Sequence, residues 1–419
     1  MNVNFSRLGS ANTYDNALGN LSDRQAGLST LQEKLTAGKR VVRASDDPTA
    51  AAQAERALNR ISRIATDLRA LESQRSTITI AESTLGDVTN TLQDFRELVV
   101  SAGNGSQTPA DRATIAGQLS GLRDQIFTLA NRKDTNGQPL FSALGSALAP
   151  FTGPNAPPQD YTFNGKPGQT ASGEFSIPSA LDGESAFMLQ PARDGAYDVT
   201  TSAIPAGRTF KTGPVTITDS SQVTNDTYTL TITNMALGAT PGSGVATYDI
   251  TGLPSGFTST GNTTAEFSST LPVTVPLAGV PGLGLSMTLT GDPRPGDSIT
   301  LTPAPSLFSV LDTTIRNIAG AANGVDAARA VAQALSNIDI GMGRVSAIRG
   351  QAGDLLNRAD SISTDQGKRS IQMEADRSRA EDMDMVKGIS EFQNQQTGYQ
   401  AALQSYAQIQ KLSLFNYLG

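Results

Sequence analysis

Carboxylates are the main groups in this sequence that could do chemistry, because the chain contains no histidine and no cysteine. Without histidine, Ser-His-Asp triads, HExxH zinc sites and most acid–base catalysis near neutral pH are excluded. Without cysteine, disulfides, thiolate nucleophiles and cysteine-ligated metals are excluded. Asp194, Asp292 and Asp297 could serve a hydrolase, but nothing in their spacing brings them together. We therefore expect no enzyme, no catalytic residue, no bound metal and no cofactor.

Three short stretches resemble ligand sites, and each has a simpler interpretation. Residues 39–43 include three basic side chains that could bind phosphate, although such residues more often favour a helix C-terminus or face solvent. Residues 134–137 resemble the start of a calcium loop but lack the later acidic ligands, so we expect a plain turn. Residues 103–106 are a glycine-rich turn without a preceding strand, which argues against a nucleotide site.

Charge and hydropathy exclude two further classes of partner. The chain has 32 basic and 39 acidic residues, a net charge of −7 and no lysine–arginine cluster, so we expect no nucleic-acid partner. It has no run of about 18 apolar residues, so we expect no membrane partner. The first thirty residues lack the apolar core of a classical signal peptide.

The stretch from Ala44 to Val99 is expected to form one long helix that organises the chain. Asp46 or Asp47 can accept hydrogen bonds from free N–H groups of the first turn, and Pro48 suits the first helical position. Residues then recur at alternating spacings of four and three, which is typical of a heptad seam. The predicted seam consists of Ala54, Leu58, Ile61, Ala65, Leu68, Glu72, Arg75, Ile78, Glu82, Leu85, Val88, Leu92, Phe95 and Val99. A seam of this length needs a partner helix from elsewhere in the chain or from another subunit.

Three charged residues, Glu72, Arg75 and Glu82, interrupt that predicted seam. One interpretation is that the partner helix ends or shifts there and leaves an exposed edge. The other is that these residues pair with charges on a neighbouring subunit.

Shorter helical patterns flank this stretch. A helix from Tyr14 is expected to stop at Gly38, and another starts at Thr108–Pro109 and folds back on the long helix. A last long helix develops after Gly324, with a stutter or a break within 363–366.

The two terminal heptad segments are short and carry glutamine on their seams, so neither is stable alone. We expect them to pair with each other and to form the assembly surface, although they could instead only hold the monomer together. The residues predicted for this surface are Leu18, Leu21, Leu28, Leu35, Ile389, Phe392, Tyr399, Leu403 and Tyr406. The apolar residues within 412–418 also need a partner surface.

The middle of the chain is rich in Gly, Pro, Thr and Ser and contains short segments of period-two alternation. These segments, at 215–217, 228–232, 248–250, 287–289 and 299–301, predict antiparallel strands in one region or in two small subdomains. The expected fold class is therefore α+β and multidomain, with a long helical coiled-coil or bundle core from both chain ends and an inserted antiparallel β region. The predicted boundaries are 1–43 and 371–419 for the terminal coiled-coil segments, 44–142 and 306–370 for the helical core, and 143–305 for the β region.

Several motifs resemble the flagellin superfamily. They are residues 35–41 (LTAGKRV), 45–48 (SDDP), 111–112 (DR), 129–131 (LAN), 136–142 (NGQPLFS), 296–299 followed by 309–311, and 406–418. The likeness covers roughly residues 1–142 and 296–419 and leaves the middle largely unmatched. Ala143 stands where the family pattern suggests glycine, and Pro139 stands where an aromatic residue is common.

This resemblance implies a structural subunit of the bacterial flagellum, extracellular and secreted by the flagellar export apparatus without a cleaved signal peptide. The ending at residues 412–418 is similar to that of subunits that join the hook to the filament, and flagellin itself, the filament subunit, is the alternative. The implied partners are further copies of the chain in a helical ring, a neighbouring hook-associated protein, flagellin, and an export chaperone before secretion.

Overall fold

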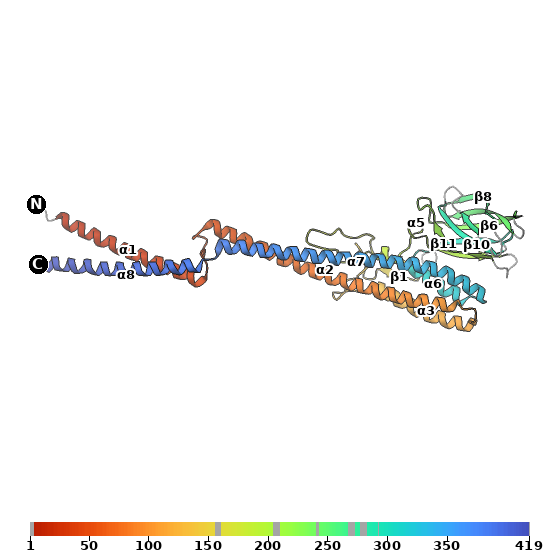
Figure 1. Cartoon of the computed structure of the whole chain (residues 1–419), viewed down its shortest axis with the longest axis horizontal. Coiled ribbons are helices and arrows are strands. Elements are labelled where there is room, and N and C mark those ends of the chain that lie inside the picture. The colour runs from red at the N-terminus through yellow and green to blue at the C-terminus, as the bar shows by residue number, and fades with distance from the viewer. Residues whose placement is uncertain are drawn as a thin grey trace. The chain divides into compact units, whose positions relative to one another are not determined.

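The computed structural model of the chain describes residues 4–155, 161–203, 210–239, 243–266, 273–276, 283–291 and 293–418 (Figure 1). The helices are α1 (Asn4–Ala37), α2 (Pro48–Ala102), α3 (Pro109–Ala130), α4 (Gly183–Phe187), α5 (Pro191–Asp194), α6 (Leu307–Ala319), α7 (Gly324–Glu381) and α8 (Met385–Leu418). The strands are β1 (Phe151–Thr152), β2 (Thr162–Phe163), β3 (Tyr197–Ser202), β4 (Phe210–Thr212), β5 (Thr216–Ile217), β6 (Thr227–Leu237), β7 (Gly244–Leu253), β8 (Phe257–Thr263), β9 (Val273–Pro276), β10 (Leu285–Gly291) and β11 (Ser298–Pro303). This confirms the predicted fold class.

The chain divides into two compact units. The terminal unit comprises Met1–Arg69 and Ile362–Gly419, and the central unit comprises Ala70–Ser361. Helices α2 and α7 each contribute residues to both units.

The central unit is built on the second half of α2. The buried side chains there recur at alternating spacings of three and four, and all of them are 0% exposed: Ile78, Ala81, Leu85, Val88, Leu92, Phe95, Val99 and Ala102. Burying one Leu, Val or Phe side chain in this way stabilises the fold by about 1.5–3 kcal/mol. The sequence therefore predicted the long helix and its heptad spacing correctly.

The first half of the seam was assigned correctly only in part. Ala54 is buried and Ile61 and Leu68 are half-buried, as predicted. Ala57 and Leu71 are buried where the prediction placed Leu58 and Glu72, which are exposed, and the predicted Ala65 is exposed as well. The partner helix lies on the side of Ala57 and Leu71, and periodicity alone does not say on which side a partner lies. Glu72 and Arg75 therefore do not interrupt the buried seam at all.

The charges near that seam instead join α2 to α7 of the same chain. Arg75 lies 3.2 Å from Asp360, Glu82 lies 2.8 Å from Arg349, and these partners show that the two helices run antiparallel. Glu72 remains an exposed edge residue that reaches Arg75 at 3.5 Å. The sequence interpretation of a charge pair was correct in kind, but the partner is intramolecular.

Helix α3 begins where the sequence predicts a helix start, and its first turn is closed by a capping box. Thr108 accepts a hydrogen bond from the Asp111 amide, and the Asp111 carboxylate accepts one from the Thr108 amide. The neighbouring Arg112 is 1% exposed and donates to the carbonyls of Gln107 (2.7 Å) and Ala321 (2.9 Å). This arginine ties the start of α3 to the connection between α6 and α7.

The described strands of the β region form three antiparallel sheets, and the two larger sheets surround one core. The larger sheet has the strand order β3-β11-β6-β7-β8, and the smaller has β4-β10-β5, with β9 paired to β10. Alternate residues of both sheets, including Leu230, Tyr248, Leu285 and Leu289, belong to one buried cluster. Strands β1 and β2 pair with each other in a separate two-stranded sheet that contributes no residue to this cluster.

Helix α7 covers the open edge of β3. The side-chain amides of Gln333 and Asn337 donate to the Tyr197 carbonyl at 2.7 and 2.9 Å, and Arg329 donates to the Thr201 hydroxyl at 2.8 Å. An edge strand with its carbonyl paired in this way is protected from pairing with other chains.

Of the stutter or break expected within 363–366, helix α7 excludes the break and is compatible with the stutter. The helix continues unbroken to Glu381, and the interruption falls at residues 382–384. The Asp384 carboxylate accepts hydrogen bonds from the amides of Val386 and Lys387, which starts α8 there.

Ala143 has a backbone φ of 56°, the left-handed conformation that glycine adopts at little cost. We expect Ala143→Gly to raise the free energy of unfolding by about 1 kcal/mol in thermal or urea unfolding. Gly38→Ala is the matched control, because Gly38 has a φ of 69° and open space around an added Cβ, so stability should fall by a similar amount. A loss of stability in Ala143→Gly would contradict this assignment of strain.

Candidate assembly surface

The terminal unit brings the two ends of the chain together. Helices α1 and α8 pack against each other, which confirms the predicted pairing. Their contacts run antiparallel: Gly27 lies against Gln395, Gly388 against Leu35, and Arg24 against Gly398. At Gly388 a Cβ would come within 3.0 Å of the Leu35 side chain, so only a glycine allows this close approach.

All nine residues predicted for the assembly surface lie on this helix pair. Six of them are half-buried between or beside the two helices: Leu21, Leu28, Leu35, Phe392, Tyr399 and Tyr406. The other three remain exposed, with Leu18 at 49%, Ile389 at 47% and Leu403 at 40%. The half-buried residues thus contribute to pairing within the chain, whereas the exposed ones keep 40–49% of their surface open to solvent.

Further large apolar side chains extend this exposed surface. The predicted assembly surface left out Ile371, Met385 and Val386, which are exposed on the last turns of α7 and the first turn of α8. The heptad pattern around these three residues is weak, and residue spacing does not show which side chains remain exposed. The side chains of residues 412–418, predicted to need a partner, lie outside the described residues.

The connections that precede α2 and α8 are held together by backbone hydrogen bonds. The amides of Arg40 and Val41 donate to the Glu381 carbonyl at 2.8 and 3.3 Å, and the Met383 amide donates to the Gly38 carbonyl at 3.0 Å. Gly38 has a φ of 69°, which ends α1 as predicted and turns the chain into this pairing. Two segments more than three hundred residues apart in sequence are thereby fixed to each other.

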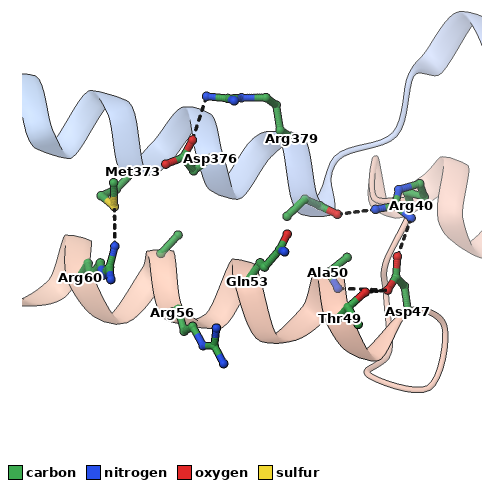
Figure 2. Close-up of a pocket in the computed structure, with 12 residues that line it drawn as sticks. Arg40, Asp47, Thr49, Ala50, Gln53, Arg56, Arg60, Met373, Asp376 and Arg379 are labelled. Atoms are coloured by element: carbon green, nitrogen blue, oxygen red, sulfur yellow. Dashed lines mark hydrogen bonds and ion pairs between the residues drawn. The ribbon is translucent and has the colours of Figure 1, made fainter.

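Basic residues of this connection are used within the chain and do not form a phosphate patch. Arg40 donates to the Ala380 carbonyl at 2.8 Å and to Asp47 at 3.0 Å, as Figure 2 shows. Lys39 pairs with Glu381, and Arg43 pairs with Glu33 at 2.8 Å. Each of the three cations therefore has an acidic partner nearby.

The two aspartates before Pro48 have different contacts. Asp47 accepts hydrogen bonds from the Ala50 amide and the Thr49 hydroxyl, so it occupies the N-cap position of α2. Asp46 accepts from the amides of Val42 and Arg43 and orders the loop instead. These backbone hydrogen bonds hold the pKa of both carboxyls below the ordinary value of 3.8.

The acidic groups considered for chemistry have structural contacts. Asp194 pairs with Arg193, and Asp297 accepts from the Arg294 amide at 2.8 Å, while Asp292 lies outside the described residues. Asp134 accepts from the amides of Asn136 and Gln138, which makes the predicted plain turn. Among the described residues no three His, Cys, Asp or Glu side chains are grouped to hold a metal ion.

None of the described helices contains a stretch long and apolar enough to cross a lipid bilayer.

Both ends of the chain match one protein family. Residues 10–145 match the bacterial flagellin N-terminal helical region, and residues 335–418 match the bacterial flagellin C-terminal helical region. The chain belongs to the flagellin family. The matched regions hold the helical parts of both units, and they leave out most of the β region.

Individual relatives differ in how much of the chain they cover. Flagellar hook-associated protein 3 of Salmonella typhimurium is 33% identical over 205 residues, which are 48% of this chain and 59% of that relative. Flagellin of Clostridium tyrobutyricum is 26% identical over 381 residues, which are 90% of this chain and 92% of that relative. The chain spans about three fifths of the length of the curated hook-associated relatives that it matches, at 59% and 63%.

A solved structure shares the fold. The crystal structure of hook-associated protein 3 from Legionella pneumophila aligns with a TM-score of 0.58 and 23% identity, covering 77% of this chain and 97% of that one. The flagellin-family helices and the inserted β region are therefore a known arrangement.

The low pKa of Asp47 makes the start of α2 sensitive to acid. A carboxyl whose pKa is lower in the folded state stabilises that state above its unfolded pKa, and the contribution is lost as pH falls through the folded pKa. We expect protection of the Ala50 amide from hydrogen exchange, relative to intrinsic rates, to fall as the pH drops below about 4. Asp47→Asn should lower this protection already at neutral pH.

Asp67→Asn is the matched control, because Asp67 lies on the same helix and has no capping contact. It should leave the exchange of Ala50 unchanged. Equal protection in Asp47→Asn and the wild-type chain would show that the cap does not hold the first turn.

Proposed function

We propose that this chain is a structural adaptor of the bacterial flagellum that joins the hook, through a neighbouring hook-associated protein, to the flagellin filament. The observation that carries the proposal is the α1–α8 pair, whose exposed Leu18, Ile389 and Leu403 need cover from other subunits. Family membership and the likeness to hook-associated protein 3 support the flagellar setting.

The proposed mechanism is packing, with no catalytic step. A two-helix pair can bury only the faces turned toward each other, and a third or fourth helix is needed to cover the rest. Helices α1 and α8 of neighbouring subunits supply that cover, and the repeated contact closes into a ring of further copies. On this proposal the assembly interface consists of the nine predicted residues of α1 and α8: Leu18, Leu21, Leu28, Leu35, Ile389, Phe392, Tyr399, Leu403 and Tyr406.

The proposal also states how the chain leaves the cell and where in the flagellum it stays. The chain is secreted through the flagellar export apparatus, without a cleaved signal peptide, after release from an export chaperone, and it stays extracellular at the hook–filament junction. A chain without cysteine forms no disulfide that would hinder passage through a narrow channel.

A second candidate function is that of flagellin, the filament subunit itself. The alignment with flagellin of Clostridium tyrobutyricum favours it, because that alignment extends over 90% of this chain. The ending at residues 412–418 favours the adaptor. The two differ in copy number, since a filament subunit occurs along the whole filament and an adaptor only at its base.

Leu403→Asp tests the assembly surface. Burying an unpaired carboxylate at an interface costs several kcal/mol, so we expect this variant to be absent from assembled flagella while its central unit stays folded. Immunoblots of purified flagella and circular dichroism of the isolated protein measure the two effects.

Leu237→Asp is the matched control, because Leu237 is 96% exposed at the end of β6 and belongs to the other unit. It should assemble like the wild-type chain. Wild-type incorporation of Leu403→Asp would refute the proposed role of α1 and α8.

A further inference from the structure

A groove lies in the terminal unit between the first turns of α2 and the last turns of α7 (Figure 2). Its volume is about 540 Å³. The groove exists because the helix-facing positions are small, with Ala50 and Ala57 on α2 opposite Ala380 on α7. Leucine side chains at these places would fill the space between the two helices.

The rim of this groove carries arginines of two kinds. Arg40 and Arg379 are paired, with Asp47 at 3.0 Å and Asp376 at 2.8 Å. Arg56 has no hydrogen bond or ion pair with any described residue, and the one contact of Arg60 is with the Met373 sulfur at 4.0 Å.

Arg63 continues the same face of α2 one turn further and also has no described partner. Arg56, Arg60 and Arg63 stand at spacings of four and three, so they form a single cationic stripe along the helix. The two carboxylates that line the groove, Asp47 and Asp376, pair with Arg40 and Arg379 and not with this stripe. An acidic surface on another molecule is the complementary partner for this stripe.

The same helix carries the complementary surface in the central unit. Asp94 and Glu97 are exposed, lie three residues apart on one face of α2, and have no described partner. Beside them Val100 is 50% exposed. The nearby Arg96 does not neutralise them, because it pairs with Asp339 of α7 at 2.9 Å.

The two surfaces match in spacing and in chemistry. Side chains three or four residues apart on a helix are about 5–6 Å apart at Cβ, so two carboxylates on one helix can meet two arginines on another. Both surfaces belong to α2, whose unbroken helical geometry keeps them from meeting within one chain. Each therefore needs a second molecule.

We propose that the groove docks the acidic face of α2 from a second copy of this chain, with Asp94 and Glu97 beside Arg56 and Arg60 and with Val100 over the alanine floor. The contact is heterologous, because one copy supplies the groove and the next supplies the acidic face, so it can repeat around a ring. It rests on the proposed assembly function and adds a contact that the terminal helices do not make. Charge complementarity of this kind fixes register between subunits.

Cross-linking tests the contact in assembled flagella, because the chain has no cysteine of its own. Gln53 lines the groove, and Asn90 lies one turn before Asp94 on the exposed side. We expect the double variant Gln53→Cys/Asn90→Cys to give dimers and higher adducts with a short bismaleimide. The control pair Gln53→Cys/Leu237→Cys and both single variants should give at least tenfold less.

Charge reversal gives a second and independent readout. Arg56→Glu/Arg60→Glu and Asp94→Arg/Glu97→Arg should each lower the number of copies per flagellum severalfold, because like charges then face each other. The combined four-residue variant should recover to within about twofold of the wild-type number. All four sites in these variants are exposed, and circular dichroism checks that each variant is folded.

The outcomes separate this contact from the proposed function. Absence of the cross-link, or a combined variant no better than either reversal, overturns the contact even when the protein lies at the hook–filament junction. Wild-type copy number in both reversed variants also overturns it. Wild-type protein found along the whole filament refutes the adaptor function instead, while a positive cross-link there leaves the contact itself supported.

Discussion

Antiparallel packing of the N-terminal helices on the C-terminal helices is the interaction on which the rest of this structure depends. Helix α2 meets α7 and helix α1 meets α8, so every helical layer is built from segments hundreds of residues apart. Contacts of such long sequence separation form only after a costly loop closure. The β region lies in the chain between the N-terminal and the C-terminal helices. A buried core that two of its sheets share makes this long connection compact.

The two units complete this packing to different degrees. In the central unit, α3, α6 and the sheet edge cover the α2–α7 pair, and the α2 seam is 0% exposed from Ile78 to Ala102. In the terminal unit, α1 and α8 pack on each other, Leu31 is buried, and most of their other described large apolar residues remain half-buried or exposed. The two pairs differ in the number of layers that cover them and also in residue kind, because the terminal seams carry glutamine.

Sequence spacing predicted most of the helical architecture. The heptads of α2, the helix start at Thr108, the stop at Gly38 and the period-two strands all depend on local rules, and the structure follows them. Periodicity could not decide between Ala57 and Leu58 as the buried position, because both choices preserve a spacing of four and three. That choice depends on where α7 lies, which is a property of the whole fold.

The assembly surface was predicted only in part, because local spacing does not show which side chains distant segments of the chain cover. Apolar heptads placed Leu18, Ile389 and Leu403 on the correct helices, and the structure adds which of their neighbours are already covered. The pairing of Arg40 with Asp47 and Ala380, the burial of Arg112 and the free charges on α2 all depend on long-range contacts. No local pattern distinguishes a paired arginine such as Arg40 from an unpaired one such as Arg56.

The central claim is that this flagellin-family chain is an adaptor at one place in the flagellum. The most direct measurement is to label Leu237→Cys, a site 96% exposed in the β region, on living cells with a thiol-reactive dye. A single spot at the base of each filament is the result that the account predicts. Label along the whole length of the filaments would contradict it and would make the chain a filament subunit.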